Sequence, residues 1–175
     1  MRDYQKLKRD LTLWMKEDAN LDAHFTTMID FYGLPTNFPG FQAAMSTQDP
    51  YRQIEILEQH FRDDIKDLRF TPYIQLHEFE ALLFADISQL DWEFLEHQKP
   101  IDDLKEVLTH FHDNPEYIDN GPHTAPSKRI IEKIPEYKGR KSSVGPVVAQ
   151  KIGLSVLRSR CLHFHQWLLQ LEKLQ

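Results

Sequence analysis

Two short runs rich in β-branched and aromatic residues constrain the fold of this chain most strongly. The first, HFTTMIDFY, covers residues 24–32, and the second, RFTPYIQL, covers residues 69–76. Runs of this length and composition predict strands. Between them, Asp49–Pro50 supplies an N-cap acceptor followed by a proline, which is typical of a helix start. The pattern HEFEALLFAD at 77–86 predicts another helix directly after the second strand. Strand, helix, strand and helix in this order predict a parallel α/β arrangement.

Helical patterns also flank this α/β segment. An amphipathic helix is predicted at the N-terminus, and the predicted helix after Asp49–Pro50 has apolar residues on one side. The apolar positions of these two helices are, respectively, Tyr4, Leu7, Leu11 and Trp14, and Ile54, Leu57, Phe61 and Ile65. We predict one domain over residues 1–175, with an α/β core at 1–90 in which helices flank a small, mainly parallel sheet.

The second half, residues 91–175, is predicted to be a helical continuation of the core. Helical patterns cover DWEFLEHQ at 91–98 and PIDDLKEVLTHFH at 100–112, and an ordered loop leads to a helix from about Pro126. KGRKSSVGP at 138–146 reads as a basic, flexible connection. The pattern from Pro146 onward is again helical, with Gly153 predicted to separate two short helices.

Composition excludes some classes of protein. The chain has 41% hydrophobic and 27% charged residues, typical of a globular domain. A net charge of −6 does not indicate a strongly basic nucleic-acid binder. No apolar run approaches the ~20 residues that a membrane span needs, and no signal-peptide pattern is present, so we expect a cytoplasmic protein without membrane contact. The single cysteine, Cys161, excludes an internal disulfide and is expected to be a buried thiol.

Acidic residues follow both predicted strands. Asp30 lies at the end of the first, and His77, Glu78 and Glu80 lie just past the second. Ligand sites of parallel α/β sheets lie outside the carboxyl ends of the strands. Carboxylates gathered there are suitable ligands for Mg²⁺ or Mn²⁺. The alternative is local: Asp30 would be a turn or cap residue, and the two glutamates would favour a helix N-terminus.

One lysine and two histidine pairs are the other candidate functional residues. Lys128 falls in the first turn of the helix predicted from Pro126, where it could contact a phosphate or stabilise transition-state charge. The alternative is a solvated lysine at a helix start. The pairs His110/His112 and His163/His165 have a spacing that points the rings away from each other on a helix. With one cysteine, the sequence has no zinc signature.

Four phrases in order resemble the bacterial family catalogued as domain of unknown function 4276. They are TTMIDFYGLP, PYIQLHEFEALLF, NPEYIDNGPHTAPSKRI and IGLSVLRSRCLHFHQWLLQLE, and the likeness covers essentially the whole chain. The family is regarded as TOPRIM-like and is similar to RloB-type proteins and to the nuclease domains of the overcoming-lysogenization-defect group. The resemblance implies a Mg²⁺- or Mn²⁺-dependent nuclease subunit that acts on DNA or RNA. It also implies an ABC- or AAA-type ATPase as partner, in an anti-phage system.

The resemblance also assigns roles to residues. Asp30 matches the acid of the second TOPRIM motif and Glu80 a shared glutamate-bearing phrase, so these two are the implied metal ligands. His77 and Glu78 belong to the same phrase, and Lys128 is the candidate basic residue, so these three are the implied catalytic residues.

The chain departs from the family pattern in two places. Tyr32 stands where TOPRIM proteins usually have a second aspartate, and the N-terminal Glu-Gly-x-Thr-Glu phrase does not occur. We therefore expect an N-terminally incomplete sheet with an exposed flank, which is a surface for self-association. These departures keep open an alternative function, a non-catalytic binding or regulatory partner of an ATPase built on a degenerate TOPRIM core.

Overall fold

The computed structural model describes residues 3–119, 121 and 123–174, which form two compact units. Unit 1 comprises Met1–Leu76 together with Trp167–Gln175, and unit 2 comprises His77–Gln166. The division therefore falls between Leu76 and His77, earlier than the expected change of character near residue 90, and the last residues return to unit 1. A single domain over residues 1–175 stays a prediction.

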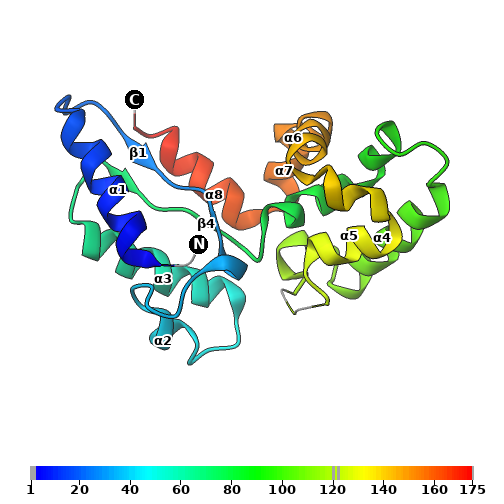
Figure 1. Ribbon diagram of the computed structural model, residues 1–175, viewed down its shortest axis with the longest axis horizontal. Coiled ribbons are helices and arrows are strands. Elements are labelled where there is room, and N and C mark those ends of the chain that lie inside the picture. The colour runs from blue at the N-terminus through cyan, green and yellow to red at the C-terminus, as the bar shows by residue number, and fades with distance from the viewer. Residues whose placement is uncertain (1–2, 120, 122, 175) are drawn as a thin grey trace. The chain divides into compact units, whose positions relative to one another are not determined.

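Unit 1 contains the four strands of the chain's described part and the helices beside them (Figure 1). The strands are β1 (Phe25–Thr26), β2 (Ile29–Asp30), β3 (Phe70–Thr71) and β4 (Ile74–Gln75). The helical segments are α1 (Tyr4–Glu17), η1 (Phe31–Gly33), α2 (Phe41–Ala44) and α3 (Pro50–Ile65), of which η1 is a 3₁₀ turn. β1 pairs with β3 and β2 with β4, and both pairs are parallel. The α/β fold with parallel pairing is thus confirmed.

Each predicted strand is divided into two short pieces at its middle. Pro72 has no N–H to give to the ladder, and it lies between β3 and β4. The Thr27 hydroxyl bridges the interruption, because its oxygen accepts the Tyr73 N–H at 3.1 Å and the hydroxyl lies 3.2 Å from the Tyr73 carbonyl oxygen. The backbone polar groups at the break are satisfied by a side chain instead of by strand pairing.

The core of unit 1 is aromatic. Tyr4 of α1 packs edge-to-face against Phe38 and Phe61, and Phe61 packs in the same way against Phe70, with ring centroids 4.9–5.8 Å apart. The predicted stripe of α1 is partly wrong: Trp14 is 54% exposed, and Met15 is buried in its place. The predicted start of α3 is confirmed, since the Asp49 carboxylate accepts the Tyr51 N–H at 3.1 Å.

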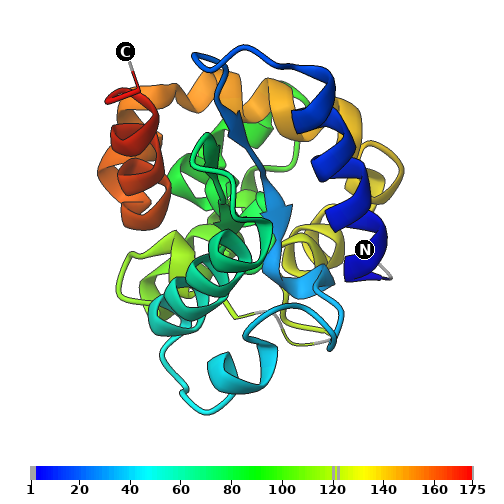
Figure 2. The ribbon, with the colours of Figure 1, turned by 90° about the vertical axis from the view of Figure 1, so that its left-hand side faces the viewer.

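The end of the chain covers the strands of unit 1 from another side. Trp167 belongs to α8 (Leu162–Leu171), and its ring stacks on Tyr73 with centroids 4.4 Å apart. Its indole N–H donates to the Thr26 hydroxyl at 2.9 Å. Figures 1 and 2 both place the strands between α1 and the C-terminal part of α8. Residues from both ends of the sequence therefore build this unit.

Unit 2 is helical and is organised around η2 (Phe79–Trp92), a long 3₁₀ segment with a break at Asp86. η2 contacts most of the surrounding elements. The other elements of unit 2 are α4 (Gln98–His110), η3 (Pro115–Tyr117), α5 (Pro126–Lys133), η4 (Pro135–Gly139), α6 (Lys141–Ile152), α7 (Leu154–Arg160) and the start of α8. The run Ala81–Ala85 is buried throughout, because neighbours surround η2 on several sides. The helical second half, the helix from Pro126 and the break at Gly153 are confirmed.

Two expectations about unit 2 are wrong. The helical pattern at 91–98 gives helix only up to Trp92, followed by a turn before α4. The segment 138–146 is not a flexible connection, because it forms the end of η4 and the first half of α6. Tertiary packing explains this helix: Val144 and Gly145 are buried, and a Cβ at Gly145 would lie 3.1 Å from the Phe79 ring. This close packing favours a helix despite Pro146.

Across residues 3–119, 121 and 123–174, none of the helices combines the length and the apolar character that crossing a bilayer requires.

Candidate functional site

Asp30, the first predicted metal ligand, lies at the carboxyl end of β2 in unit 1. It is exposed, and its partner in the parallel pair is Gln75 of β4. Gln75 is fully buried, and its amide oxygen accepts the Tyr73 hydroxyl at 2.6 Å. The two neighbouring strand ends therefore differ: one presents a carboxylate to solvent, and the other an amide that is used inside the unit.

The other predicted site residues, His77, Glu78, Glu80 and Lys128, lie in unit 2. The predicted set is thus divided between the two units. Three of the four are buried, with His77, Glu78 and Glu80 only 5–7% exposed. Buried ionisable side chains need partners inside the protein, and these partners indicate what each residue does.

His77 is held in an unusual backbone conformation. Its φ is +62°, in the left-handed region that non-glycine residues seldom adopt. Its Nε2 lies 3.1 Å from the carbonyl oxygen of Glu116. A carbonyl oxygen only accepts, so Nε2 carries the hydrogen and Nδ1 keeps a lone pair. Burial lowers the pKa of His77. The ring is therefore a neutral group, and its Nδ1 has no hydrogen-bond partner in the described part of the chain.

Glu78 caps a helix that is distant in sequence. One of its carboxylate oxygens accepts the backbone N–H of Ser127 in the first turn of α5. The N-cap residue of α5 is Ala125, whose side chain has no acceptor, and Pro126 has no N–H. The glutamate therefore supplies the negative charge that a helix N-terminus favours. The Ser127 hydroxyl beside it is buried, with no partner among the described residues.

Glu80 has a phenol and an ammonium group close to its carboxylate. The Tyr137 hydroxyl lies 3.4 Å and the Lys141 Nζ 3.5 Å from its Oε1. Burial, and after it the negative charge of Glu80, raises the pKa of Tyr137. The phenol therefore remains protonated and can donate to the carboxylate. These two polar neighbours supply partners for the Glu80 carboxylate in its largely buried position.

Two lysines of unit 2 are candidate basic residues, and Lys128 lies in the first turn of the helix from Pro126, as predicted. Lys128 is exposed on the first turn of α5. The cation beside Glu80 is Lys141 at the start of α6. Lys141 belongs to the segment 138–146, for which the sequence predicts a flexible connection. Its signal was weak, because a lysine in a Gly/Ser-rich stretch reads as solvated. Lys141 therefore joins Lys128 as a candidate basic residue.

Glu116 is a further buried acid that sequence reasoning missed. It is fully buried, and its carboxylate accepts the backbone N–H groups of His163 at 3.0 Å and Phe164 at 3.1 Å. It thus caps the start of α8, much as Glu78 caps α5. Next to α8, Cys161 is a buried thiol, as expected, and burial together with the charge of Glu116 raises its pKa. No signal in the proline-rich segment around Glu116 indicated this role.

We searched for clusters of metal-ligating side chains. Among the residues that the structure describes, no group of three or more His, Cys, Asp or Glu residues is arranged to hold a metal ion. A site with a full set of protein ligands, such as structural zinc, is therefore not found in this part of the chain. Mg²⁺ sites commonly use only one or two carboxylates and complete their shell with water and substrate phosphate.

Comparison with known proteins gives one match. Neither curated proteins nor solved structures gave a match to this chain. A family model does match, over residues 2–172, and thus over nearly the whole sequence. The chain belongs to the family described as domain of unknown function DUF4276.

Proposed function

We propose that this protein is a cytoplasmic, Mg²⁺- or Mn²⁺-dependent nuclease subunit that works with an ABC- or AAA-type ATPase in bacterial anti-phage defence. Its reaction would be hydrolysis of phosphodiester bonds in DNA or RNA. The observation that carries the proposal is Asp30, an exposed carboxylate at the carboxyl end of a parallel strand. Ligand sites of parallel α/β proteins lie at such ends. The resemblance of the acid-bearing phrases to TOPRIM-like nucleases supports the same reading.

The donor chemistry fits a hard divalent cation. Asp30 in unit 1 and Glu80 in unit 2 are the two proposed carboxylate ligands, each taken within its own unit, and carboxylate oxygen is the protein ligand that Mg²⁺ prefers. When bound, the ion would polarise the phosphodiester and lower the pKa of a water nucleophile. Asp30 is accessible from solvent, and Glu80 is held by the Tyr137 phenol and the Lys141 ammonium.

The remaining residues would position the substrate. Lys128 is exposed at the start of α5 and is available to contact a phosphate. Glu78 holds the first turn of that helix through the Ser127 N–H and thereby positions the backbone of Lys128. Lys141 would share its positive charge between Glu80 and the phosphate. The neutral His77 offers an acceptor at Nδ1 for a proton at the site.

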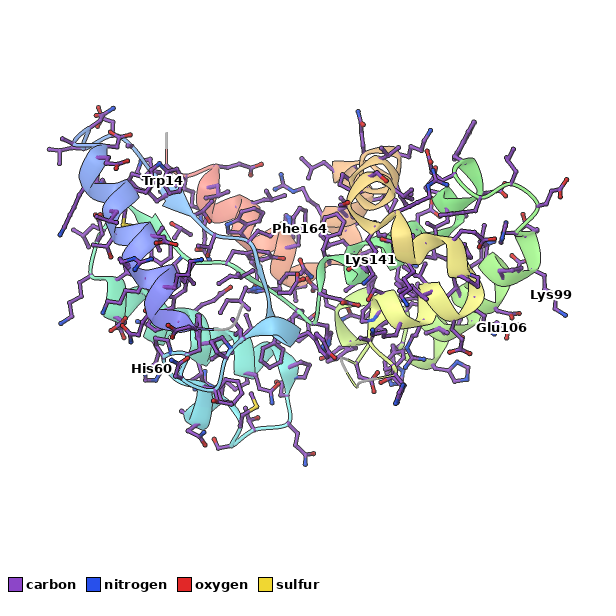
Figure 3. The ribbon with its side chains drawn as sticks, viewed as in Figure 1. Trp14, His60, Lys99, Glu106, Lys141 and Phe164 are labelled. Atoms are coloured by element: carbon purple, nitrogen blue, oxygen red, sulfur yellow. The ribbon has the colours of Figure 1, made fainter. Side chains whose placement is uncertain are left out.

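Cleavage assays with matched variants test this proposal. The chain, with and without its partner ATPase, is incubated with plasmid DNA or single-stranded RNA in the presence of Mg²⁺ or Mn²⁺. We expect Asp30→Asn and Glu80→Gln each to reduce cleavage by about 10²-fold or more, because each removes a charged group that acts on the transition state. The controls Asp22→Asn and Glu106→Gln remove exposed carboxylates, and Glu106 points outward from α4 (Figure 3). Unchanged cleavage in both site variants would disprove the assignment.

A second candidate function is a non-catalytic partner module for the ATPase. It is favoured by the use of acids inside unit 2, where Glu78 and Glu116 cap helices. Calorimetric titration of the full chain with Mn²⁺ separates the two candidates. Binding that is weakened in Asp30→Asn or Glu80→Gln supports the nuclease. No binding by the chain, alone or with the ATPase, supports the partner module.

A further inference from the structure

Unit 1 has a groove that none of the candidate site residues line. It lies between the end of α3, the segment that leads into β3, and the C-terminal end of α8, and its volume is about 850 Å³. Volumes of this size are typical of sites that bind ligands. Its walls combine three basic side chains, Arg62, Lys66 and Lys173, with the apolar residues Leu68, Phe70 and Leu174.

The three basic side chains are exposed and lack ion-pair partners within residues 3–119, 121 and 123–174. Arg62 lies in the last turn of α3, and Lys66 is the residue that caps this end of the helix, about 6 Å further along its axis. Like charges at this spacing repel each other, and an anion placed between them would relieve the repulsion. Lys66 also acts electrostatically on Asp64, which is already engaged by Lys8 and Tyr4.

The two acids that line the groove are both engaged. Asp67 forms an ion pair with Arg69 at 2.9 Å, and the hydrogen bonds from Arg69 lower its pKa. Asp63 accepts a hydrogen bond from the Gln59 side chain at 2.9 Å. A hydrogen bond from a neutral amide does not cancel a carboxylate charge, so Asp63 counts against the three cations, which outnumber it. The groove is therefore locally basic although the whole chain has a net charge of −6.

The apolar wall adds a second requirement for the ligand. Leu68 is completely exposed and stands beside Leu174 in the lining, whereas large apolar residues usually gain free energy from burial. A suitable ligand therefore has several negative charges in a row and apolar groups between them. Single-stranded nucleic acid has both features, because its phosphates repeat along the chain and each base between them has an apolar face.

We propose that this groove binds the backbone of single-stranded DNA or RNA, with Arg62, Lys66 and Lys173 on phosphates and Leu68 against a base. The inference rests on the proposed nuclease function, since it assigns the substrate a binding surface on unit 1. Two cations at the end of α3, Arg62 and Lys66, suit successive phosphates better than a single carboxylate. An acidic protein segment is the competing ligand, and the experiment below distinguishes it.

Binding is measured by fluorescence anisotropy with a labelled oligothymidylate in EDTA, so that the result does not depend on cleavage. Three phosphate contacts predict a dissociation constant that rises about 20-fold between 50 and 200 mM salt. The triple variant Arg62→Gln, Lys66→Asn and Lys173→Gln is expected to bind at least about tenfold more weakly and to lose most of the salt dependence. Asn is chosen at position 66 because φ is +59° there.

The matched control is Lys6→Gln, Lys99→Gln and Lys138→Gln, which removes the same charge from exposed positions elsewhere; Lys99 points outward from α4 (Figure 3). Circular dichroism and thermal unfolding verify that both triple variants fold. Binding that survives in the control and is lost in the groove variant supports the proposal. Equal loss in both variants, equal retention in both, or absence of binding by the native chain overturns it. Polyglutamate that competes as well as the oligonucleotide also overturns it, in favour of an acidic protein segment.

Failure of this proposal and failure of the nuclease function are distinguishable. Asp30→Asn is expected to abolish cleavage while oligonucleotide binding in EDTA stays within about twofold of the native chain. If the native chain binds through the groove but never cleaves, the nuclease proposal fails and the binding surface stands. If cleavage depends on Asp30 but the groove variant binds the oligonucleotide as tightly as the native chain, the substrate reaches the site by another surface.

Discussion

At the scale of single residues, buried polar side chains of unit 2 satisfy backbone groups far away in the sequence. Glu78 accepts an N–H at the start of α5, and Glu116 accepts two at the start of α8. His77 donates to the carbonyl of Glu116. Each of these residues would be costly to bury without its partner. They explain how charged residues of the family phrase HEFE can lie inside the unit.

His77 should make the stability of the protein depend on pH. Its pKa is lowered in the folded state by burial, whereas the unfolded chain has an ordinary histidine pKa of about 6.5. The unfolded state therefore binds the proton more readily, and the free energy of unfolding falls as pH drops below about 6.5. The stabilisation is fully present above that pH. We expect His77→Gln, which keeps a donor but does not titrate, to show a shallower fall.

Urea unfolding at several pH values between 5 and 8 provides the measurement. His24→Gln is the control, because it removes an exposed histidine of unit 1. A pH dependence that is identical in the native chain and in His77→Gln would show that the ring is not buried as described.

At the scale of elements, backbone conformation decides where the C-terminal helices divide. Gly153 ends α6 and precedes α7 with φ +80° and ψ 150°, a region that only glycine adopts readily. A Cβ at this position would meet nothing within 4 Å. The glycine is therefore required by its dihedral angles and not by packing.

Alanine substitutions at two glycines separate these effects. Gly153→Ala is expected to lower the free energy of unfolding by about 1–3 kcal/mol, because alanine is strained at this φ and ψ. Gly139→Ala is the matched control, since its Cβ also meets nothing within 4 Å and its φ lies outside the left-handed region. We expect it to change stability by less than about 0.5 kcal/mol. Denaturant unfolding of both variants gives the comparison, and equal effects would contradict the conformational argument.

Local signals made much of this element order predictable. Asp49–Pro50, Pro126 and Gly153 act through their own dihedral angles and hydrogen-bonding groups, so the sequence alone reveals them. The first half of α6 was missed because Val144 and Gly145 gain their helical conformation from packing on η2, a non-local contact. Glu116 was missed for the same reason: its partners, His163 and Phe164, are 47 and 48 positions away. Asp30 was located at a strand end, yet its metal role stays a prediction.

At the scale of the whole molecule, unit 1 depends on residues from both ends of the chain. Trp167 stacks on Tyr73 and donates to Thr26. These two contacts join the C-terminal segment to β1 and to the link between β3 and β4. Unit 2 is by contrast made of one continuous stretch, His77–Gln166.

Substitution of Trp167 should therefore destabilise unit 1 strongly. We expect Trp167→Ala to cost about 3 kcal/mol through lost packing, and Trp167→Phe to cost about 1 kcal/mol because it keeps a ring on Tyr73 and loses the hydrogen bond. The control is Trp92→Ala, whose ring is 69% exposed beneath Lys151, with an expected cost below about 1 kcal/mol. Urea unfolding followed by circular dichroism measures all three. Equal costs for the Ala and Phe variants would exclude stacking as the source.

The Trp167–Thr26 hydrogen bond also has a consequence for the order of events during synthesis. The two residues are 141 positions apart, so at ribosomal rates Trp167 emerges on the order of ten seconds after Thr26. Tyr73 is itself made 94 positions before Trp167, and until Trp167 emerges its ring lacks the partner on which it stacks. Unit 2, in contrast, receives all of its residues in one uninterrupted interval. The part of the chain that is translated first is thus among the last to complete its fold.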